Sequence, residues 1–180
     1  MALKPKFSII TITYNAASVI RPTLDSVISQ TYTNYEYILV DGGSMDDTVA
    51  IAKASGIGFA HIISERDKGI YDAMNKGIAL ATGDYLCFLN AGDAFYDSET
   101  LQKIVDAIAN EKELPDVLYG ETAEVDEKRN FVRMRRLQAP TKLDWRSFRN
   151  GMLVCHQAFY ARREIAPMYD LKYRLSADVD

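Results

Sequence analysis

One acidic residue stands shortly after an uninterrupted apolar run. Residues 85–89 (YLCFL) are all apolar, and they end abruptly at Asn90-Ala91-Gly92-Asp93. An apolar run without alternation is typical of a strand that is covered on both faces, as in a parallel sheet. Ligands bind at the carboxyl ends of such strands, and Asp93 is a candidate ligand of Mg²⁺ or Mn²⁺ because these ions prefer oxygen atoms. The competing interpretation is that Gly-Asp only forms a loop before the next helix.

Two other predicted strands also end in polar turns. Residues 7–14 (FSIITITY) are rich in β-branched residues and run into Asn15, and residues 36–40 run into Asp41-Gly42-Gly43-Ser44. Because parallel strands share their carboxyl edge, we expect these two turns to meet the Asn90–Asp93 turn at one rim. Three polar corners at one rim fit a nucleotide with a metal-bridged diphosphate, although each string alone could be ordinary turn chemistry.

Strand and helix patterns alternate through the first 110 residues. Strands are predicted at 7–14, 36–40, 59–64 and 85–89, and helices at 20–30, 44–54, 70–81 and 98–108. This alternation predicts an α/β protein with a mostly parallel sheet, helices on both faces and right-handed crossovers.

The pattern changes after Pro115. Strands are predicted at 116–125 and 130–136, joined by a polar turn, followed by a loop or short helix at 145–150 and a strand at 152–160. We therefore expect one domain over residues 1–180, with a nucleotide-binding part at 1–110 and the start of an acceptor-binding part at 111–180. The last residues form an unfinished pattern, which suggests truncation at the C-terminus.

Composition narrows the classes of partner and compartment. The 180 residues carry a net charge of -4, which argues against nucleic acid as a partner. Cys87 and Cys155 both lie in apolar runs and are expected to be buried thiols. No run reaches the ~18 apolar residues of a spanning helix, so a cytoplasmic location is the default and a peripheral membrane role stays open.

Other polar residues are weaker candidates. Asp178 is a late carboxylate in an apolar setting, which suits a general base, although most acidic residues are simply exposed. His156 lies in an apolar segment and could contact a diphosphate or an acceptor, or be a core histidine. Asp72 and Asn75 share a helix face and could face a donor, or be solvated.

Matching segments extend through most of the chain. The chain resembles the family 2 glycosyltransferases of the GT-A fold, a Rossmann-like fold of nucleotide-diphospho-sugar transferases. The resemblance is carried by residues 8–15 (SIITITYN), 26–48 (SVISQTYTNYEYILVDGGSMDDT), 67–93 (DKGIYDAMNKGIALATGDYLCFLNAGD), 155–163 (CHQAFYARR) and 175–180 (LSADVD).

The resemblance implies a role for each matching position. Asp41 would help to hold the base or ribose, Asp93 would bind the divalent cation, Mn²⁺ or Mg²⁺, and Asp178 would be the general base. The nucleoside pocket would be lined by Thr13, Tyr14 and Asn15. Apart from the resemblance, Asn90 can donate or accept hydrogen bonds, and His156, Asp72 and Asn75 remain candidate substrate contacts on the grounds given above.

The chain departs from the commonest family pattern at two places. Many members carry a second acidic residue where Gly42 stands and a more acidic cluster around Asn90 and Gly92. The cation would then rest on Asp93, the diphosphate and water, which suits Mg²⁺.

The resemblance implies transfer of a sugar from a nucleoside-diphosphate sugar to a saccharide or lipid-linked acceptor, in cell-surface polysaccharide synthesis. One base and one cation, without a covalent intermediate, give inversion at the anomeric carbon. A nucleotide-binding module without catalysis is the main alternative. A nucleotidyltransferase is a weaker one, because no Gly-rich, basic loop follows the first strand.

Overall fold

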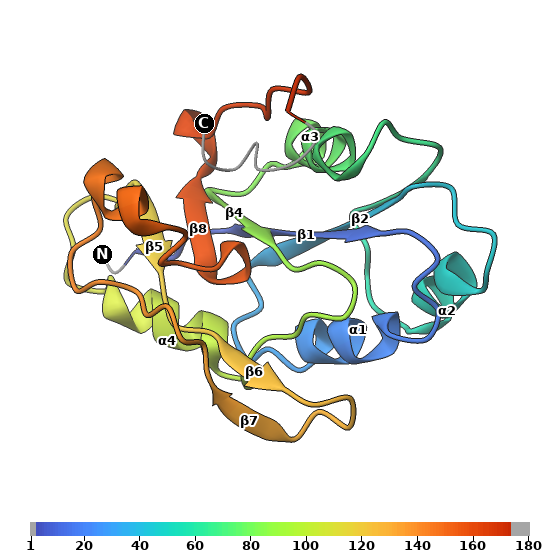
Figure 1. The fold of residues 1–180 in the computed structure, drawn as a ribbon, viewed down its shortest axis with the longest axis horizontal. Coiled ribbons are helices and arrows are strands. Elements are labelled where there is room, and N and C mark those ends of the chain that lie inside the picture. Colours follow the sequence, from blue (N-terminus) through green and yellow to red (C-terminus); the bar gives the residue numbers. More distant parts are fainter. Residues whose placement is uncertain (1–2, 174–180) are drawn as a thin grey trace.

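A six-stranded sheet forms the centre of the molecule. The computed structural model describes residues 3–173 of the chain, and Figure 1 shows its arrangement. The strand order is β3-β2-β1-β4-β8-β5. These strands are β1 (Phe7–Thr13), β2 (Tyr35–Asp41), β3 (His61–Ser64), β4 (Tyr85–Phe88), β5 (Val117–Tyr119) and β8 (Phe159–Arg162).

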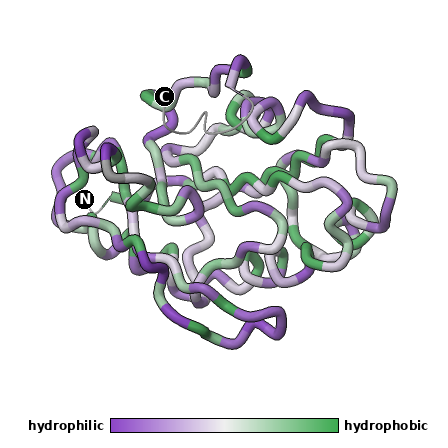
Figure 2. Tube along the Cα trace, viewed as in Figure 1, coloured by the Kyte–Doolittle hydropathy of each residue, from purple (hydrophilic) through white to green (hydrophobic). Residues whose placement is uncertain are grey.

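Strands β1 to β4 are mutually parallel, whereas β8 runs antiparallel to both β4 and β5. The predicted α/β class and mostly parallel sheet are therefore confirmed. The central strand β1 is buried at every position, as expected for a strand covered on both faces. Figure 2 shows the same pattern as hydrophobic colouring along the middle strands.

Helices cover both faces of the sheet. The helices are α1 (Ile20–Ile28), α2 (Thr48–Ala54), α3 (Ile70–Leu80) and α4 (Thr100–Ala107). Helices α1, α2 and α4 bury their apolar residues against one face. Helix α3 packs on the other face together with the segment that contains Ala166 and Tyr169.

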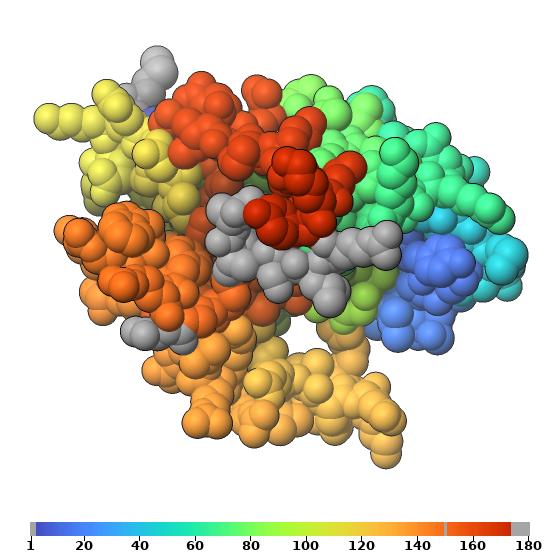
Figure 3. Space-filling model, turned by 45° about the horizontal axis from the view of Figure 1, so that its top comes forward, coloured from blue at the N-terminus to red at the C-terminus, as the bar shows by residue number. Residues whose placement is uncertain are grey.

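A small hairpin projects from the second part of the chain. It consists of β6 (Ala123–Val125) and β7 (Phe131–Met134), which pair antiparallel outside the main sheet. Figure 3 shows the hairpin as an arm with a hollow between it and the body of the molecule. Short 3-10 helices occur at Trp145–Asn150, His156–Ala158 and Arg163–Ile165.

Two predicted strands have different bounds in the structure. Residues 116–125 form two strands in different sheets, because the chain leaves the main sheet at Gly120, whose N–H bonds to the carbonyl of Ala158. The strand predicted at 152–160 is instead β8, preceded by the 3-10 turn at His156–Ala158. The reason is that His156 and Gln157 direct their side chains to the turn after β4.

Strand register brings the predicted corners together. Thr13 pairs with Asp41 across β1 and β2, and Asp41 pairs with Ser64 across β2 and β3. On the other side of β1, the N–H of Ala91 bonds to the carbonyl of Ile12. The carboxyl ends of β1, β2 and β4 therefore lie next to each other along one edge.

Within residues 3–173, no helix has the length and apolar character needed to cross a membrane.

Candidate functional site

The turns after β1 and β2 are fastened to each other. The N–H of Gly42 donates to the carbonyl of Thr13 over 2.9 Å. Asn15 donates its N–H to Ser44 Oγ at 2.8 Å and accepts from the N–H of Met45 through Oδ1 at 2.9 Å. Asn15 has a φ of 47°, a left-handed conformation that asparagine tolerates better than most residues. The predicted first and second corners thus form one rigid unit.

Asp41 is the centre of this unit. Its side chain is fully buried, and its carboxylate accepts hydrogen bonds from the N–H groups of Gly43 (3.2 Å) and Ser44 (2.9 Å). The hydroxyl of Ser44 and that of Ser64 (2.7 Å) donate to it as well. This geometry supports a role in shaping the turn, whereas a direct contact with base or ribose stays a prediction.

A second acidic residue lies at the open side of the same corner. An added Cβ at Gly42 would lie 2.6 Å from Oδ2 of Asp67 and 3.4 Å from Cδ2 of Tyr14. Tyr14 is 60% exposed, so its ring is available beside the Asp67 carboxylate. A side chain at position 42 would therefore displace the Asp67 carboxylate. This steric conflict explains why an acidic residue does not fit at position 42 here, where many members of the family carry one.

Backbone contacts hold the turn after β4 in place. The buried hydroxyl of Thr23 on α1 donates to the carbonyl of Asp93 at 2.6 Å and accepts from the N–H of Gly92 at 2.9 Å. Gly92 has a φ of 102°, which favours glycine. The loop thus presents Asp93 in one defined orientation.

The carboxylate of Asp93 is partly buried beside a cavity. Gln157 donates from Nε2 to Oδ2 of Asp93 at 3.0 Å, and Cys155 Sγ donates to Oε1 of Gln157 at 2.6 Å. Burial raises the pKa of the Asp93 carboxyl, although the Gln157 bond and the nearby His156 and Arg129 act in the opposite direction. Cys155 is half-buried, not fully buried as predicted, because its thiol takes part in this chain of hydrogen bonds.

His156 and Gln157 act on opposite ends of the same turn. His156 Nε2 lies 3.1 Å from Nδ2 of Asn90, while Gln157 contacts Asp93. Oδ1 of Asn90 is buried without a hydrogen-bond partner within the described residues, and so is Oγ1 of Thr13. Unpaired buried oxygens are unusual, and a ligand at the rim would satisfy them.

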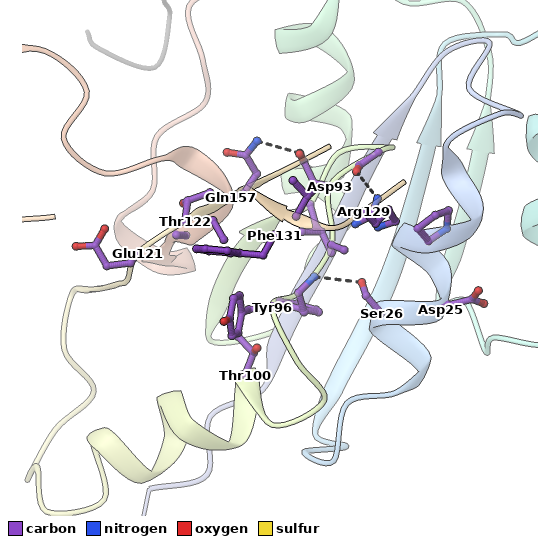
Figure 4. A pocket seen from close by; sticks show the side chains of 18 of the residues that line it. Asp25, Ser26, Asp93, Tyr96, Thr100, Glu121, Thr122, Arg129, Phe131 and Gln157 are labelled. Atoms are coloured by element: carbon purple, nitrogen blue, oxygen red, sulfur yellow. Dashed lines mark hydrogen bonds between the residues drawn. The ribbon is translucent and has the colours of Figure 1, made fainter. Parts of the chain in front are cut away.

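The cavity has a volume of about 670 Å³ and lies between the turn after β4, α1 and the hairpin. Figure 4 shows Asp93 and Gln157 on one side, with Tyr96 and Phe131 facing the space from different elements. Arg129 at the hairpin turn donates from Nη1 to the carbonyl of Gly92 at 3.2 Å. That contact joins the hairpin to the Asp93 loop.

The donor set fits a cation that shares its ligands with a substrate. Among the described residues only Gln157 donates a side-chain hydrogen bond to the Asp93 carboxylate, and the unpaired Oδ1 of Asn90 belongs to the same turn. Within residues 3–173 no cluster of three His, Cys, Asp or Glu could hold a metal alone. Mg²⁺ and Mn²⁺ are often held by one or two carboxylates with substrate phosphates, so the set is compatible with such an ion.

Two predicted substrate contacts on α3 are occupied by the protein itself. Both ends of the Asn75 amide bond to the backbone of Tyr169, at 2.9 and 2.8 Å, and fasten that segment to α3. Asp72 accepts from the N–H of Lys68 at 3.0 Å and lies 3.8 Å from Lys76. Neither side chain takes part in the contacts that join the three corners, but Asp72 lines a second cavity together with Asp67. A substrate contact by Asp72 or Asn75 stays a prediction. Asp178 lies outside the described residues.

Sequence reasoning overlooked Asp67, Gln157 and Arg129. Asp67 begins the matching segment at 67–93, and Gln157 follows His156 directly, so both had a signal in the sequence. Arg129 had none, since its contact with Gly92 depends on how the hairpin docks.

The fold and the three corners define a protein of the GT-A class. The family model described as "Glycosyl transferase family 2" matches residues 8–166, and the chain belongs to that family.

Curated relatives carry glycosyltransferase names. The chain is 42% identical over 183 residues to "PGL/p-HBAD biosynthesis glycosyltransferase" of Mycobacterium bovis, covering 98% of this chain and 68% of the relative. It is 36% identical to an uncharacterised glycosyltransferase of Mycobacterium tuberculosis, again covering 68% of that protein.

Solved structures show the same fold. S. aureus TarS in complex with UDP-GlcNAc has a TM-score of 0.59 and 25% identity, covering 69% of this chain and 36% of TarS. The mannosyltransferase PcManGT from Pyrobaculum calidifontis, solved with GDP-Man and Mn²⁺, has a TM-score of 0.58 and 22% identity, covering 66% of this chain and 36% of that one. The chain thus spans about a third of these two solved proteins.

Proposed function

We propose that this chain transfers a sugar from a nucleoside-diphosphate sugar to a saccharide or lipid-linked acceptor, with inversion and with help from a divalent cation, in cell-surface polysaccharide synthesis. The observation that carries the proposal is the Asp93 carboxylate. It lies beside a cavity, at the same sheet edge as the joined turns after β1 and β2. Membership of the family supports the reaction type.

The joined first and second corners would bind the nucleoside. Tyr14 offers an exposed ring and Asp67 a carboxylate next to it, which suits stacking and hydrogen bonding to a base or ribose. Thr13 and Asn90 each contribute an unpaired oxygen. Asn15 holds the turn in shape, and its direct contact with the donor remains part of the proposal.

Asp93, with Asn90 beside it, would hold the cation together with the donor's diphosphate. Such an ion, when bound, neutralises negative charge on the leaving diphosphate. Gln157 keeps the Asp93 carboxylate oriented, and His156 lies at the Asn90 end of the turn, where it could contact the diphosphate.

Asp178 is proposed to accept the proton of the acceptor hydroxyl as its oxygen attacks the anomeric carbon of the donor sugar. The nucleoside diphosphate would leave in the same step, which would invert the anomeric carbon. A saccharide acceptor would leave the protein in the cytoplasm. A lipid-linked acceptor would bring it, as a peripheral protein, to the inner face of the membrane.

A turnover assay tests the proposal. We expect the full chain to hydrolyse or transfer sugar from a UDP- or GDP-sugar in the presence of Mn²⁺, and Asp178→Asn to lose that activity while still binding UDP or GDP. A product with the donor's anomeric configuration would contradict the inverting mechanism.

A nucleotide-binding module without catalysis is the second candidate. It is favoured by Gly42 and Gly92, which stand where many members of the family carry acidic residues. Nucleotide binding without any turnover by the full chain would support it, and turnover that Asp178→Asn abolishes would eliminate it.

A further inference from the structure

The cavity beside Asp93 is a compartment separate from the nucleoside corner. Asp93 lines it, whereas Thr13, Asp41 and Asp67 are not among the described residues that do. Its volume of about 670 Å³ lies in the ~300–1,000 Å³ range typical of small-molecule sites. A ligand in this cavity would therefore touch Asp93 without competing for the place of the base.

Two exposed aromatic side chains line the cavity. Tyr96 is 75% exposed and Phe131 is 59% exposed, and they come from the loop before α4 and from β7. Large apolar rings that face solvent around a cavity are typical of a binding surface. The apolar C–H face of a pyranose ring packs well against such rings, while its hydroxyls remain free for polar groups.

Polar groups surround the aromatic pair. Glu121, Thr122 and Gln157 line the same cavity and can bond to sugar hydroxyls. Oε1 of Glu121 accepts from the N–H of Ala139 at 3.0 Å, which fixes its carboxylate.

The charge of the lining disfavours an anionic ligand. Three residues with carboxylates, Asp25, Asp93 and Glu121, line the cavity, together with one guanidinium, that of Arg129. Arg21 pairs with Asp25 at 2.9 Å, which still leaves two carboxylates against one cation. A phosphate or carboxylate group that is not neutralised by a bound cation would be repelled in the cavity, whereas an uncharged sugar would not.

We propose that this cavity binds the terminal sugar of the acceptor as an uncharged pyranose ring stacked on Tyr96 and Phe131, with a hydroxyl directed to the Asp93 side. This inference rests on the proposed function, because it names the acceptor of the same reaction. The substrate class is a neutral glycoside, and any phosphate of the acceptor would lie outside the cavity.

The test is a titration of the full chain with UDP or GDP present, monitored by ¹H–¹⁵N NMR shifts. Mg²⁺ is the cation in this titration, because it is diamagnetic and leaves the signals near Asp93 observable. The probes are the methyl pyranosides of glucose, galactose, mannose and rhamnose, with glucose 1-phosphate as the anionic comparison. We expect at least one methyl pyranoside to shift the amide signals of Gly92 and Glu121, and glucose 1-phosphate to leave them unchanged.

Variants locate the binding. Tyr96→Ala and Phe131→Ala should each weaken pyranoside binding by roughly tenfold, since each removes one stacking ring. Val132→Ala and Trp145→Ala are matched controls, because Val132 (56% exposed) and Trp145 (70% exposed) do not line the cavity, and binding should be unchanged in both. Thermal unfolding would verify that all four variants fold.

The outcomes separate this proposal from the donor assignment. If nucleotide binds with Mg²⁺ but no pyranoside shifts the cavity signals, or if both aromatic variants bind as wild type does, the acceptor assignment is wrong and the donor proposal stands. Stronger binding of glucose 1-phosphate would also overturn it. If pyranosides bind in the cavity but no nucleotide binds, the donor proposal fails instead.

Discussion

Two aspartates at one sheet edge have opposite surroundings. Asp41 is fully buried, and four donors of the protein bond to its carboxylate. Asp93 accepts one side-chain bond, from Gln157, and lines a cavity. Asp41 is the last residue of β2, whereas Asp93 lies in the turn that follows β4.

The difference indicates separate roles for the two aspartates. A carboxylate whose lone pairs are occupied by protein donors stabilises the fold, whereas one with a single side-chain donor beside a cavity has capacity left for a ligand. Asp41 therefore shapes the corner, and Asp93 is the candidate ligand in our proposal.

Replacing the two aspartates should separate stability from binding. Asp41→Ala is expected to lower the free energy of unfolding by about 4 kcal/mol, because it leaves several buried donors unpaired. Asp93→Ala should change it by less than about 1 kcal/mol, since burial already disfavours the charge of that carboxylate. Urea unfolding measures both, and equal losses would break the comparison.

A third carboxylate extends the comparison to the opposite edge of the sheet. Glu36 is 9% exposed and accepts bonds from Lys6 (2.7 Å), Ser8 (2.6 Å) and the N–H of Thr82 (2.6 Å). Burial opposes its ionisation, but these bonds outweigh burial and lower the pKa of Glu36 from 4.5 to about 2.

Acid should therefore remove stability that Glu36 supplies. Because the folded pKa lies below the unfolded value, the stabilisation is complete above pH 4.5 and is lost as the pH falls towards 2. We expect a loss of about 2–3 kcal/mol over that window, measured by urea unfolding at several pH values. Glu36→Gln should flatten this pH dependence, and an unchanged slope in that variant would show that other groups cause it.

Gln157 tests whether orientation of Asp93 matters for the cation. Residues that only orient a metal ligand typically contribute ~10–100-fold to affinity, so Gln157→Ala should weaken Mn²⁺ binding in the presence of UDP or GDP by roughly tenfold. As the pH is lowered, Mn²⁺ binding should be lost at a higher pH in Gln157→Ala than in wild type. The reason is that the removed hydrogen bond lowers the pKa of Asp93. Paramagnetic resonance of Mn²⁺ over a pH series measures both effects.

The control for Gln157 is Cys155→Ser, which keeps a donor to Oε1 of Gln157 and should retain most of the affinity. A pH profile that does not move in Gln157→Ala would contradict the orienting role.

Gly42 gives the smallest expected effect. Gly42→Ala places a methyl group 2.6 Å from Oδ2 of Asp67 and should turn that carboxylate away. We expect nucleotide binding to fall roughly threefold, with unfolding changed by less than about 1 kcal/mol. Gly58→Ala, at a glycine with open space around it, is the matched control, and equal nucleotide affinity in both variants would argue against a role for Asp67.

The sequence predicts the strands and turns whose structure depends on local residue patterns. Apolar runs and polar turns locate β1, β2 and β4, and the rule for parallel strands places their carboxyl ends together, as the strand register confirms. The same patterns predict helices that begin at Ser44 and Ser98, but α2 begins at Thr48 and α4 at Thr100. Ser44 instead donates its hydroxyl to Asp41 within the same turn and accepts from the N–H of Asn15, so these contacts replace helix capping there.

The sequence could not predict side-chain contacts between elements that are far apart in the chain. Nothing in the local pattern shows that Gln157 reaches Asp93, that Tyr169 occupies Asn75, or that Arg129 reaches Gly92. Each contact joins residues far apart in the chain, and each changes how a candidate site residue is interpreted.

The central claim is that Asp93 is the protein's own ligand for a cation that binds with a nucleoside diphosphate. The most direct test is calorimetric titration of UDP and GDP into wild type and Asp93→Ala, with and without Mn²⁺. We predict that Mn²⁺ strengthens binding to wild type and that Asp93→Ala loses this gain, on the order of a hundredfold. A variant that binds nucleotide with the same Mn²⁺ dependence as wild type would contradict the account.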